Sequence, residues 1–175
     1  MKSLRTGMRL LIAAGLLVCV PYSVAGDDSK EKVFHARLDG AHETPSISTL
    51  ATGSFRATLN AAGDELAYEL EYSGLEGGNT LFAHVHLGQK SVAGGVMFFL
   101  CGGGGKPACP NGSATVTGTV NANNIIGPSG QGITAGEFDE AIRAMREGIA
   151  YANVHTVTFP AGEIRGQINS NSADR

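Results

Sequence analysis

From residue 33 onward the chain consists of short alternating or apolar segments separated by turns. In "VFHARLDG" every second residue is apolar, which is the period of a strand with one buried face. "GSFRATLN" and "ELAYELEYSG" flank "AAGD", which is a hairpin signature. "GGVMFFL" is a fully apolar run, and "ATVTGTV" is rich in β-branched residues. Many short strands joined by glycine-rich turns predict an all-β fold, an antiparallel Greek-key β-barrel or sandwich.

One segment has a helical period instead. In "TAGEFDEAIRAMREG", Thr134 and Glu137 have the spacing of a capping box, and Gly148 provides a stop. The apolar residues between them fall on one face, which predicts a short amphipathic helix near 134–147 that covers one end of the barrel. The closing "IAYANVHTVTFPAGEIRGQI" predicts a hairpin that turns at residues 160–162.

The N-terminus has the pattern of a secretory signal peptide. Three basic residues precede an apolar run at 10–20, which is too short to span a bilayer comfortably. Small residues at 23–25 then offer a cleavage site. We therefore expect residues 1–25 to be removed on export to the periplasm or the extracellular space, which leaves 26–33 as an N-terminal segment.

The charge of the exported chain excludes one class of partner. Loss of residues 1–25 removes three positive charges and lowers the formal net charge from −3 to −6. An acidic domain is a poor candidate for nucleic-acid binding, because that binding depends on basic contacts to phosphate. No second apolar segment is long enough to cross a membrane, and the remaining residues suit one domain with a single core.

Cysteine usage agrees with export. Cys19 leaves with the signal peptide, and Cys101 and Cys109 remain on either side of "GGGGKPA". In an oxidising compartment a disulfide that closes this loop is the default, and two free thiols or a metal-binding pair are the alternatives.

Two of the five histidines stand one residue apart in "TLFAHVHLG". Side chains alternate along a strand, so His84 and His86 share the face opposite the core, about 6.6 Å apart along the strand. Two imidazoles at that spacing can converge on a metal ion, although two solvated polar side chains would give the same pattern.

A third histidine joins this face from the last hairpin. In "YANVHTV", His155 points outward together with Tyr151, and Tyr151 and Phe82 can shield the group. Three histidines on one outer face predict a metal site formed by His84, His86 and His155. Imidazole ligands suit copper or zinc best, with nickel and iron behind.

Several motifs together resemble a known family. "LDGAHETP", "FAHVHLG", "GEFDEAI" and "GIAYANVHTVTFPAGEIRGQI" are similar to the CHRD domain, which is named from chordin and is common in secreted bacterial proteins. The resemblance covers 34–168 and leaves 169–175 as a C-terminal tail. It implies an extracellular module, which can bind a protein partner or matrix without catalysis. Where the family usually has a neutral residue before the Glu of its opening motif, this chain has His42.

A more distant resemblance concerns chemistry. "FAHVHLG" looks like the strand of copper–zinc superoxide dismutases that supplies two copper ligands on the outer face of a Greek-key barrel, and a later "VH" strand supplies a third. The resemblance implies one copper ion per chain, held by His84, His86 and His155. No histidine lies between His86 and His155, so no zinc cluster is expected. The fourth ligand is then His42, Glu43 or water.

Arg165 is the candidate for anion steering. With a turn at 160–162, Arg165 would lie opposite Val157 and near the proposed metal, where its charge could attract a small anion such as superoxide. The alternative is a structural salt bridge with Glu163 or Glu43. The sequence thus supports two functions: a copper-binding protein with copper-only superoxide dismutase activity, or a non-catalytic extracellular binding module. It does not choose between them.

Overall fold

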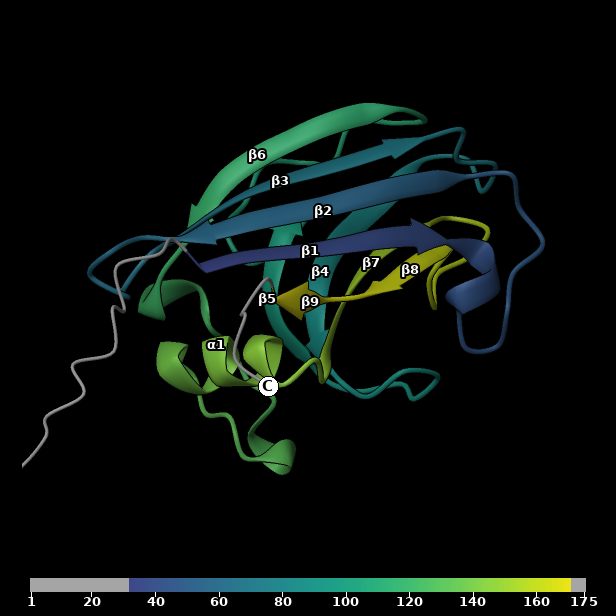
Figure 1. Ribbon diagram of the computed structural model, residues 1–175. Helices are drawn as coiled ribbons and strands as arrows, with labels where there is room; N and C mark the ends of the chain where they lie inside the picture. Colours follow the sequence, from purple (N-terminus) through teal and green to yellow (C-terminus); the bar gives the residue numbers. More distant parts are fainter. Residues whose placement is uncertain (1–31, 171–175) are drawn as a thin grey trace, which may run out of the picture.

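The described part of the chain, residues 32–170 of a computed structural model, contains nine strands and one α-helix (Figure 1). The predicted signal peptide lies outside the described residues, as do residues 26–31 and 171–175. The strands are β1 (Lys32–Asp39), β2 (Thr52–Leu59), β3 (Leu66–Ser73), β4 (Thr80–Leu87), β5 (Val96–Cys101), β6 (Ala114–Val120), β7 (Ala150–Thr156), β8 (Ile164–Gln167) and β9 (Asn169–Ser170).

All strand pairs are antiparallel, in the order β5-β4-β7-β8-β1-β2-β3-β6, with β9 beside β1. The sheet curls into a nearly closed barrel. In Figure 1, β1, β2, β3 and β6 form one wall, and β4, β5, β7 and β8 lie across from it. β6 returns to pair with β3 after the β4–β5 hairpin has crossed to the other wall, which is a Greek-key connection. The predicted all-β barrel is confirmed.

Alternating apolar side chains from both walls fill the barrel. The largest buried apolar side chains include Phe34, Leu38, Phe55, Leu66, Leu70, Phe98, Leu100, Ile164 and Ile168. β5 departs from alternation, because bulges in its pairing with β4 occur between Ala83 and His84 and between Val85 and His86. A bulge turns neighbouring side chains toward the same side. It accounts for the burial of both Met97 and Phe98.

The single described α-helix, α1 (Phe138–Arg146), lies at one end of the barrel (Figure 1). It begins four residues later than the sequence predicted. The Thr134 N–H donates to Glu137 Oε2 at 2.6 Å, as a capping box requires, but Gly136 has φ +90° and keeps this turn out of the helix. Within residues 32–170, no helix is long and apolar enough to cross a membrane.

At the seam between β5 and β6, side chains of β3 make hydrogen bonds to β5 and to the loop that follows it. Strands β5 and β6 are not paired with each other. Tyr68 Oη donates to the Leu100 carbonyl at 2.7 Å, and Tyr72 Oη donates to the Pro110 carbonyl at 2.5 Å. A disulfide joins Cys101 to Cys109 beside this seam, which confirms the predicted pair.

The predicted register of the last hairpin is wrong. Asn153, not Val157, pairs with Arg165. The chain does turn where the sequence predicted, since the Gly162 N–H donates to the Phe159 carbonyl at 3.1 Å, but the connection between β7 and β8 spans 157–163. The cause is Glu163, whose buried carboxylate accepts hydrogen bonds from the Thr49 and Thr156 hydroxyls and from the backbone N–H groups of Glu76 and Gly77, at 2.7–3.0 Å. These contacts hold the connection against the 76–79 segment.

Candidate metal centre

Strands β4 and β7 bring the three predicted histidines together. The pairing places His84 opposite Asn153 and Phe82 opposite His155, so the two histidines meet on a diagonal. The centroid of the His84 ring lies 4.4 Å from that of the His86 ring and 4.4 Å from that of the His155 ring. The centroids of the His86 and His155 rings are 6.1 Å apart. One ring nitrogen from each side chain lies within 4.8 Å of the others. That separation allows all three to bind a single ion.

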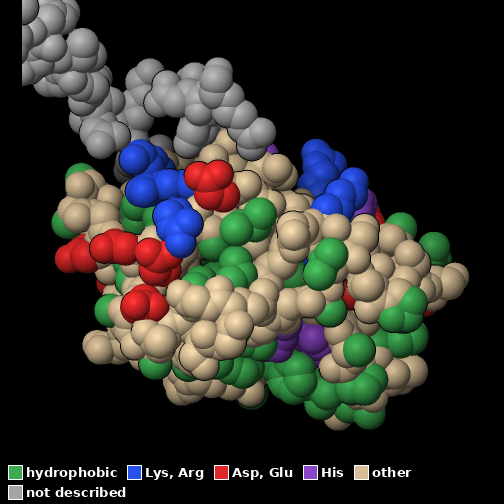
Figure 2. All heavy atoms as spheres, turned by 90° about the horizontal axis from the view of Figure 1, so that it is seen from below, with side chains coloured by type: hydrophobic (Ala, Val, Ile, Leu, Met, Phe, Trp, Pro, Cys, Tyr) green, Lys and Arg blue, Asp and Glu red, His purple; other side chains and the backbone are tan. Residues whose placement is uncertain are grey.

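The histidines are almost fully buried, which excludes the alternative of solvated polar side chains on the outer face. His84, His86 and His155 are 4%, 8% and 5% exposed. They point away from the barrel core, but the loop after β4 and the loop between β7 and β8 pack against them, as the ring contacts with Gly94 and Pro160 show. Figure 2 shows histidine side chains reaching the surface in a gap between hydrophobic and other neutral side chains.

Backbone carbonyls orient two of the rings. His86 Nδ1 lies 2.8 Å from the Gly94 carbonyl oxygen, and His155 Nδ1 lies 3.1 Å from that of Pro160. A carbonyl only accepts, so each Nδ1 carries the hydrogen, and each neutral ring keeps a lone pair on Nε2. Carbonyl partners of this kind fix the tautomer of metal-binding histidines.

Three of the other four ring nitrogens are buried without a protein partner. His86 Nε2, His155 Nε2 and His84 Nδ1 are buried without a hydrogen bond. Buried polar atoms are almost always paired, so three unpaired nitrogens in one cluster call for a ligand. Neutral imidazole nitrogens with free lone pairs are the donor set that copper and zinc bind.

Burial also keeps these rings neutral. Loss of hydration lowers the pKa of His86 and of His155 to about 4, with smaller effects from their backbone hydrogen bonds and nearby charges. The same cause, together with the neighbouring histidines, holds the pKa of His84 far below its usual value. At neutral pH no proton competes with a metal ion for the ring nitrogens.

Aromatic rings form the apolar side of the centre. The Phe82 ring lies 5.2 Å from the His84 ring and 4.9 Å from the His155 ring. Phe99, which the bulges in β5 turn toward this face, meets His84 edge-on at 5.1 Å. A Cβ at Gly103 would overlap the Phe99 ring, so the disulfide-closed glycine loop packs directly behind this wall.

Tyr151 and Arg165 form the other side. The Tyr151 ring stacks on the His86 ring with centroids 4.6 Å apart and 4° between planes. The Arg165 guanidinium carbon lies 3.4 Å from the Tyr151 ring centroid. β7 runs between β4 and β8, so Tyr151 separates Arg165 from His86. The guanidinium donates to the Gln89 and Val92 carbonyls of the loop after β4, each at 2.9 Å.

The candidate fourth ligands lie outside the histidine group. His42 is exposed, and its Nδ1 lies 2.7 Å from Asp39 Oδ1. Glu43 is buried and accepts a hydrogen bond from Asn153 Nδ2 at 2.5 Å. Burial raises the pKa of the Glu43 carboxyl to about 7, which the Asn153 hydrogen bond and the Arg165 charge oppose only in part. Within residues 32–170, only His84, His86 and His155 form a group with metal-binding geometry.

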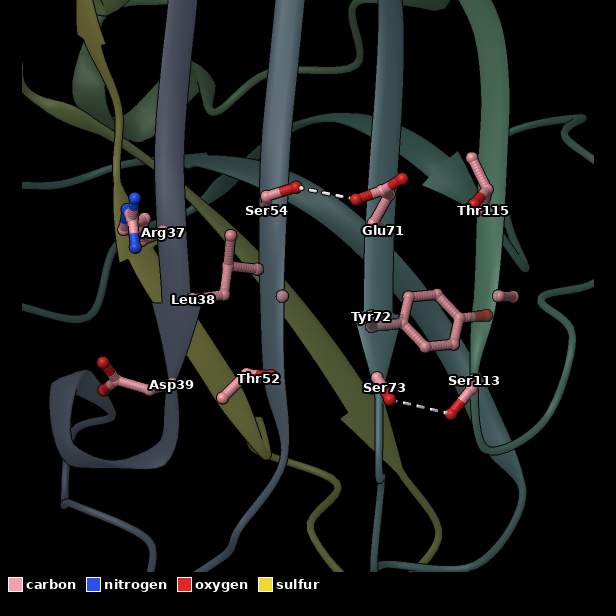
Figure 3. Close-up of a pocket in the computed structure, with 12 residues that line it drawn as sticks. Arg37, Leu38, Asp39, Thr52, Ser54, Glu71, Tyr72, Ser73, Ser113 and Thr115 are labelled. Carbon is pink, nitrogen blue, oxygen red and sulfur yellow. Dashed lines mark hydrogen bonds between the residues drawn. The ribbon is translucent and has the colours of Figure 1, made fainter.

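A groove of about 840 Å³ lies on the opposite wall, over β1, β2, β3 and β6 (Figure 3). Short hydroxyl side chains dominate its rim, with hydrogen bonds between Ser54 and Glu71 at 3.4 Å and between Ser113 and Ser73 at 3.2 Å. Its described lining contains no histidine or cysteine. The groove is a polar sheet surface separate from the histidine centre.

The carbonyls of Gly94 and Pro160 are functional groups that the sequence patterns did not identify, because a side-chain pattern carries no information about a carbonyl. At residue 94 the sequence signal is the glycine itself. A Cβ there would overlap the Leu87 carbonyl oxygen, so only glycine allows the loop to fold back against β4.

These features define an all-β domain with a buried three-histidine centre and one disulfide. The family model of the CHRD domain matches residues 34–168, so the chain belongs to the CHRD family. This is an extracellular type of domain, and the disulfide is consistent with export. Comparison with curated proteins and with solved structures gave no match.

Proposed function

We propose that this CHRD domain is exported and binds one copper ion per chain through His84, His86 and His155. The observation that carries the proposal is the set of three buried ring nitrogens without a partner in one cluster. The ligand atoms would be His84 Nδ1 and the Nε2 atoms of His86 and His155. Water completes the coordination, since neither His42 nor Glu43 belongs to the group.

Copper suits this donor set for two reasons. Among divalent first-row metals, copper forms the most stable complexes with nitrogen ligands. All three ligands are also neutral, with no carboxylate or thiolate in the group, and copper tolerates such a set in both of its common oxidation states. Bound copper would supply one-electron chemistry, and superoxide disproportionation is the specific activity that the "HVH" strand suggests. In that reaction Arg165 would act on the anion through its charge, because Tyr151 stands between it and the histidines.

Copper retention after desalting tests the binding proposal. The exported chain should keep about one equivalent, and each single change of His84, His86 or His155 to Ala should weaken binding by about 100-fold or more. His35→Ala and His42→Ala are matched controls, because both histidines are exposed and lie outside the group. Retention of copper by the triple His→Ala variant would refute the site.

Superoxide consumption tests the activity separately. The copper-loaded chain should consume superoxide faster than an equal amount of free copper does, with a chelator present in both assays. The triple variant should not. If the loaded chain is inactive, the domain is a copper-binding module without dismutase activity, as the alternative extracellular binding function implies.

A further inference from the structure

Arg165 carries a positive charge that no neighbouring carboxylate neutralises directly. Its side chain is 3% exposed, and its hydrogen-bond partners are the Gln89 and Val92 carbonyls and the Thr44 hydroxyl, all neutral. Within residues 32–170, no carboxylate lies at ion-pair distance from it. A guanidinium keeps its proton at all accessible pH values, so the charge is permanent.

This charge lies one aromatic ring away from a proposed metal ligand. Tyr151 is held between the Arg165 guanidinium at 3.4 Å and the His86 ring at 4.6 Å. The Tyr151 hydroxyl accepts a hydrogen bond from the Gly94 N–H, which fixes the ring in this stack. Arg165 therefore cannot reach the metal position, and its influence there is electrostatic.

The surroundings of the centre amplify that influence. Buried charges interact more strongly than exposed ones, because little water screens them. The three ligands are neutral, and Phe82 and Phe99 exclude water on the other side. The cost of burying an ion rises with its charge, and no anionic ligand compensates for the second positive charge of Cu(II).

We infer that the Arg165–Tyr151 stack makes the three-histidine centre selective for Cu(I) over Cu(II). The inference rests on the proposed copper site and assigns Arg165 a positioning and electrostatic role. The repulsion from Arg165 acts on one unit of charge in Cu(I) and on two in Cu(II), so it weakens Cu(II) binding more.

The ratio of the Cu(I) and Cu(II) dissociation constants is the measurement, obtained with competing chelators specific for each ion. Arg165→Gln should change this ratio by about tenfold in favour of Cu(II) binding. That change equals about 59 mV in the reduction potential of a one-electron couple. Arg165→Lys loses the planar group that reaches both carbonyls but retains the positive charge, so the ratio should stay within about threefold of the wild type. The matched control is Arg37→Gln, which removes the same charge from the exposed groove of the opposite wall (Figure 3) and should change the ratio by less than about twofold.

Glu43→Gln is a second variant with the opposite expected sign. Glu43 lies beside Asn153, and Gln keeps an acceptor for the Asn153 amide. At about pH 8, above the Glu43 pKa of about 7, this change removes a negative charge and should shift the ratio toward Cu(I). If Arg165→Gln does not fold, judged by its near-ultraviolet circular dichroism, the Glu43→Gln result decides alone.

The outcomes separate the two proposals. If copper binds with one equivalent but a folded Arg165→Gln leaves the ratio within about twofold of the wild type, the electrostatic role of Arg165 is wrong, whatever Glu43→Gln does, and the copper site stands. If Arg165→Lys shifts the ratio as far as Arg165→Gln, the effect is structural, and the inference is overturned as well. If the wild type binds neither ion, the proposed function itself fails.

Discussion

His86 Nδ1 is hydrogen-bonded to the carbonyl of Gly94 at 2.8 Å, and the N–H of the same glycine donates to Tyr151 Oη at 3.1 Å. One residue thus holds both the imidazole and the ring stacked on it. The orientation of His86 depends on the loop after β4 as much as on the strand that carries it.

Gly94→Ala should therefore weaken copper binding by about 10–100-fold, the usual cost of disturbing a partner of a ligand. The added Cβ overlaps the Leu87 carbonyl and displaces the loop. Gly130→Ala is the control, because a Cβ at Gly130 meets nothing within 4 Å. Copper titration of both variants measures the effect, and equal affinities would show that the Gly94 carbonyl does not orient the ligand.

The metal-free domain should lose stability as the pH falls from about 6.5 toward 4. The pKa of His86 and of His155 is lowered to about 4 by burial, so in this window the unfolded chain binds protons that the folded chain does not. The free energy of unfolding then decreases with falling pH.

Glu43 has the opposite effect on the free energy of unfolding between about pH 7 and 4.5, because its pKa is raised in the folded state. The contribution of this one carboxyl is smaller than that of the three histidines. Urea unfolding across this range measures the slope, which should be much smaller in the triple His→Ala variant.

Glu163→Gln should lower the free energy of unfolding by about 3 kcal/mol, since an amide NH₂ cannot accept the hydrogen bonds that one carboxylate oxygen now accepts. The Glu163 carboxylate is fully buried and receives four donors. Glu71→Gln is the matched control on an exposed strand position, with a single long hydrogen bond from Ser54, and should cost less than about 0.5 kcal/mol. Denaturant unfolding measures the loss of stability in both variants. Similar losses would show that the Glu163 carboxylate has no special structural role.

Replacing Cys101 and Cys109 by Ala should lower the free energy of unfolding by about 2 kcal/mol, as the chain-entropy model gives for so short a loop. The loop packs on Phe99, which lies against His84, so copper affinity should also fall, by less than about tenfold. Thermal unfolding with and without reductant provides the check. Reductant should destabilise the wild type and leave the double variant unchanged.

Much of the fold and the ligand set could be predicted because both follow from local alternation. The period of two in "FAHVHLG" and "YANVHTV" places three histidines on one face, and the structure brings them together. Shielding by Phe82 and Tyr151 could be predicted from the same pattern, but the almost complete burial of the three histidines could not. It arises from loops whose conformations depend on distant partners, such as the Arg165 contacts with Gln89 and Val92.

The errors in register and orientation have equally specific causes. The β7–β8 hairpin is displaced by the hydrogen bonds of Glu163, a residue that alternation alone assigns to an outer surface. The place of Phe99 beside His84 depends on bulges in β5, and an unbroken apolar run gives no sign of them. Arg165 points away from the core, as alternation predicts, but the Tyr151 ring lies between its guanidinium and the His86 ring.

The pairing of β4 with β7 also determines when a metal could be captured. His86 and His155 are neighbours in space, yet β5, β6 and α1 all lie between them along the chain. Contacts between such distant segments form late, because closing a long loop costs entropy before the contacts can stabilise the chain. Before β7 is in place, a folding chain would display only the His84–His86 pair, a weak chelate. The complete donor set would arise when β7 docks and Pro160 follows, so tight metal capture would mark the end of folding rather than its beginning.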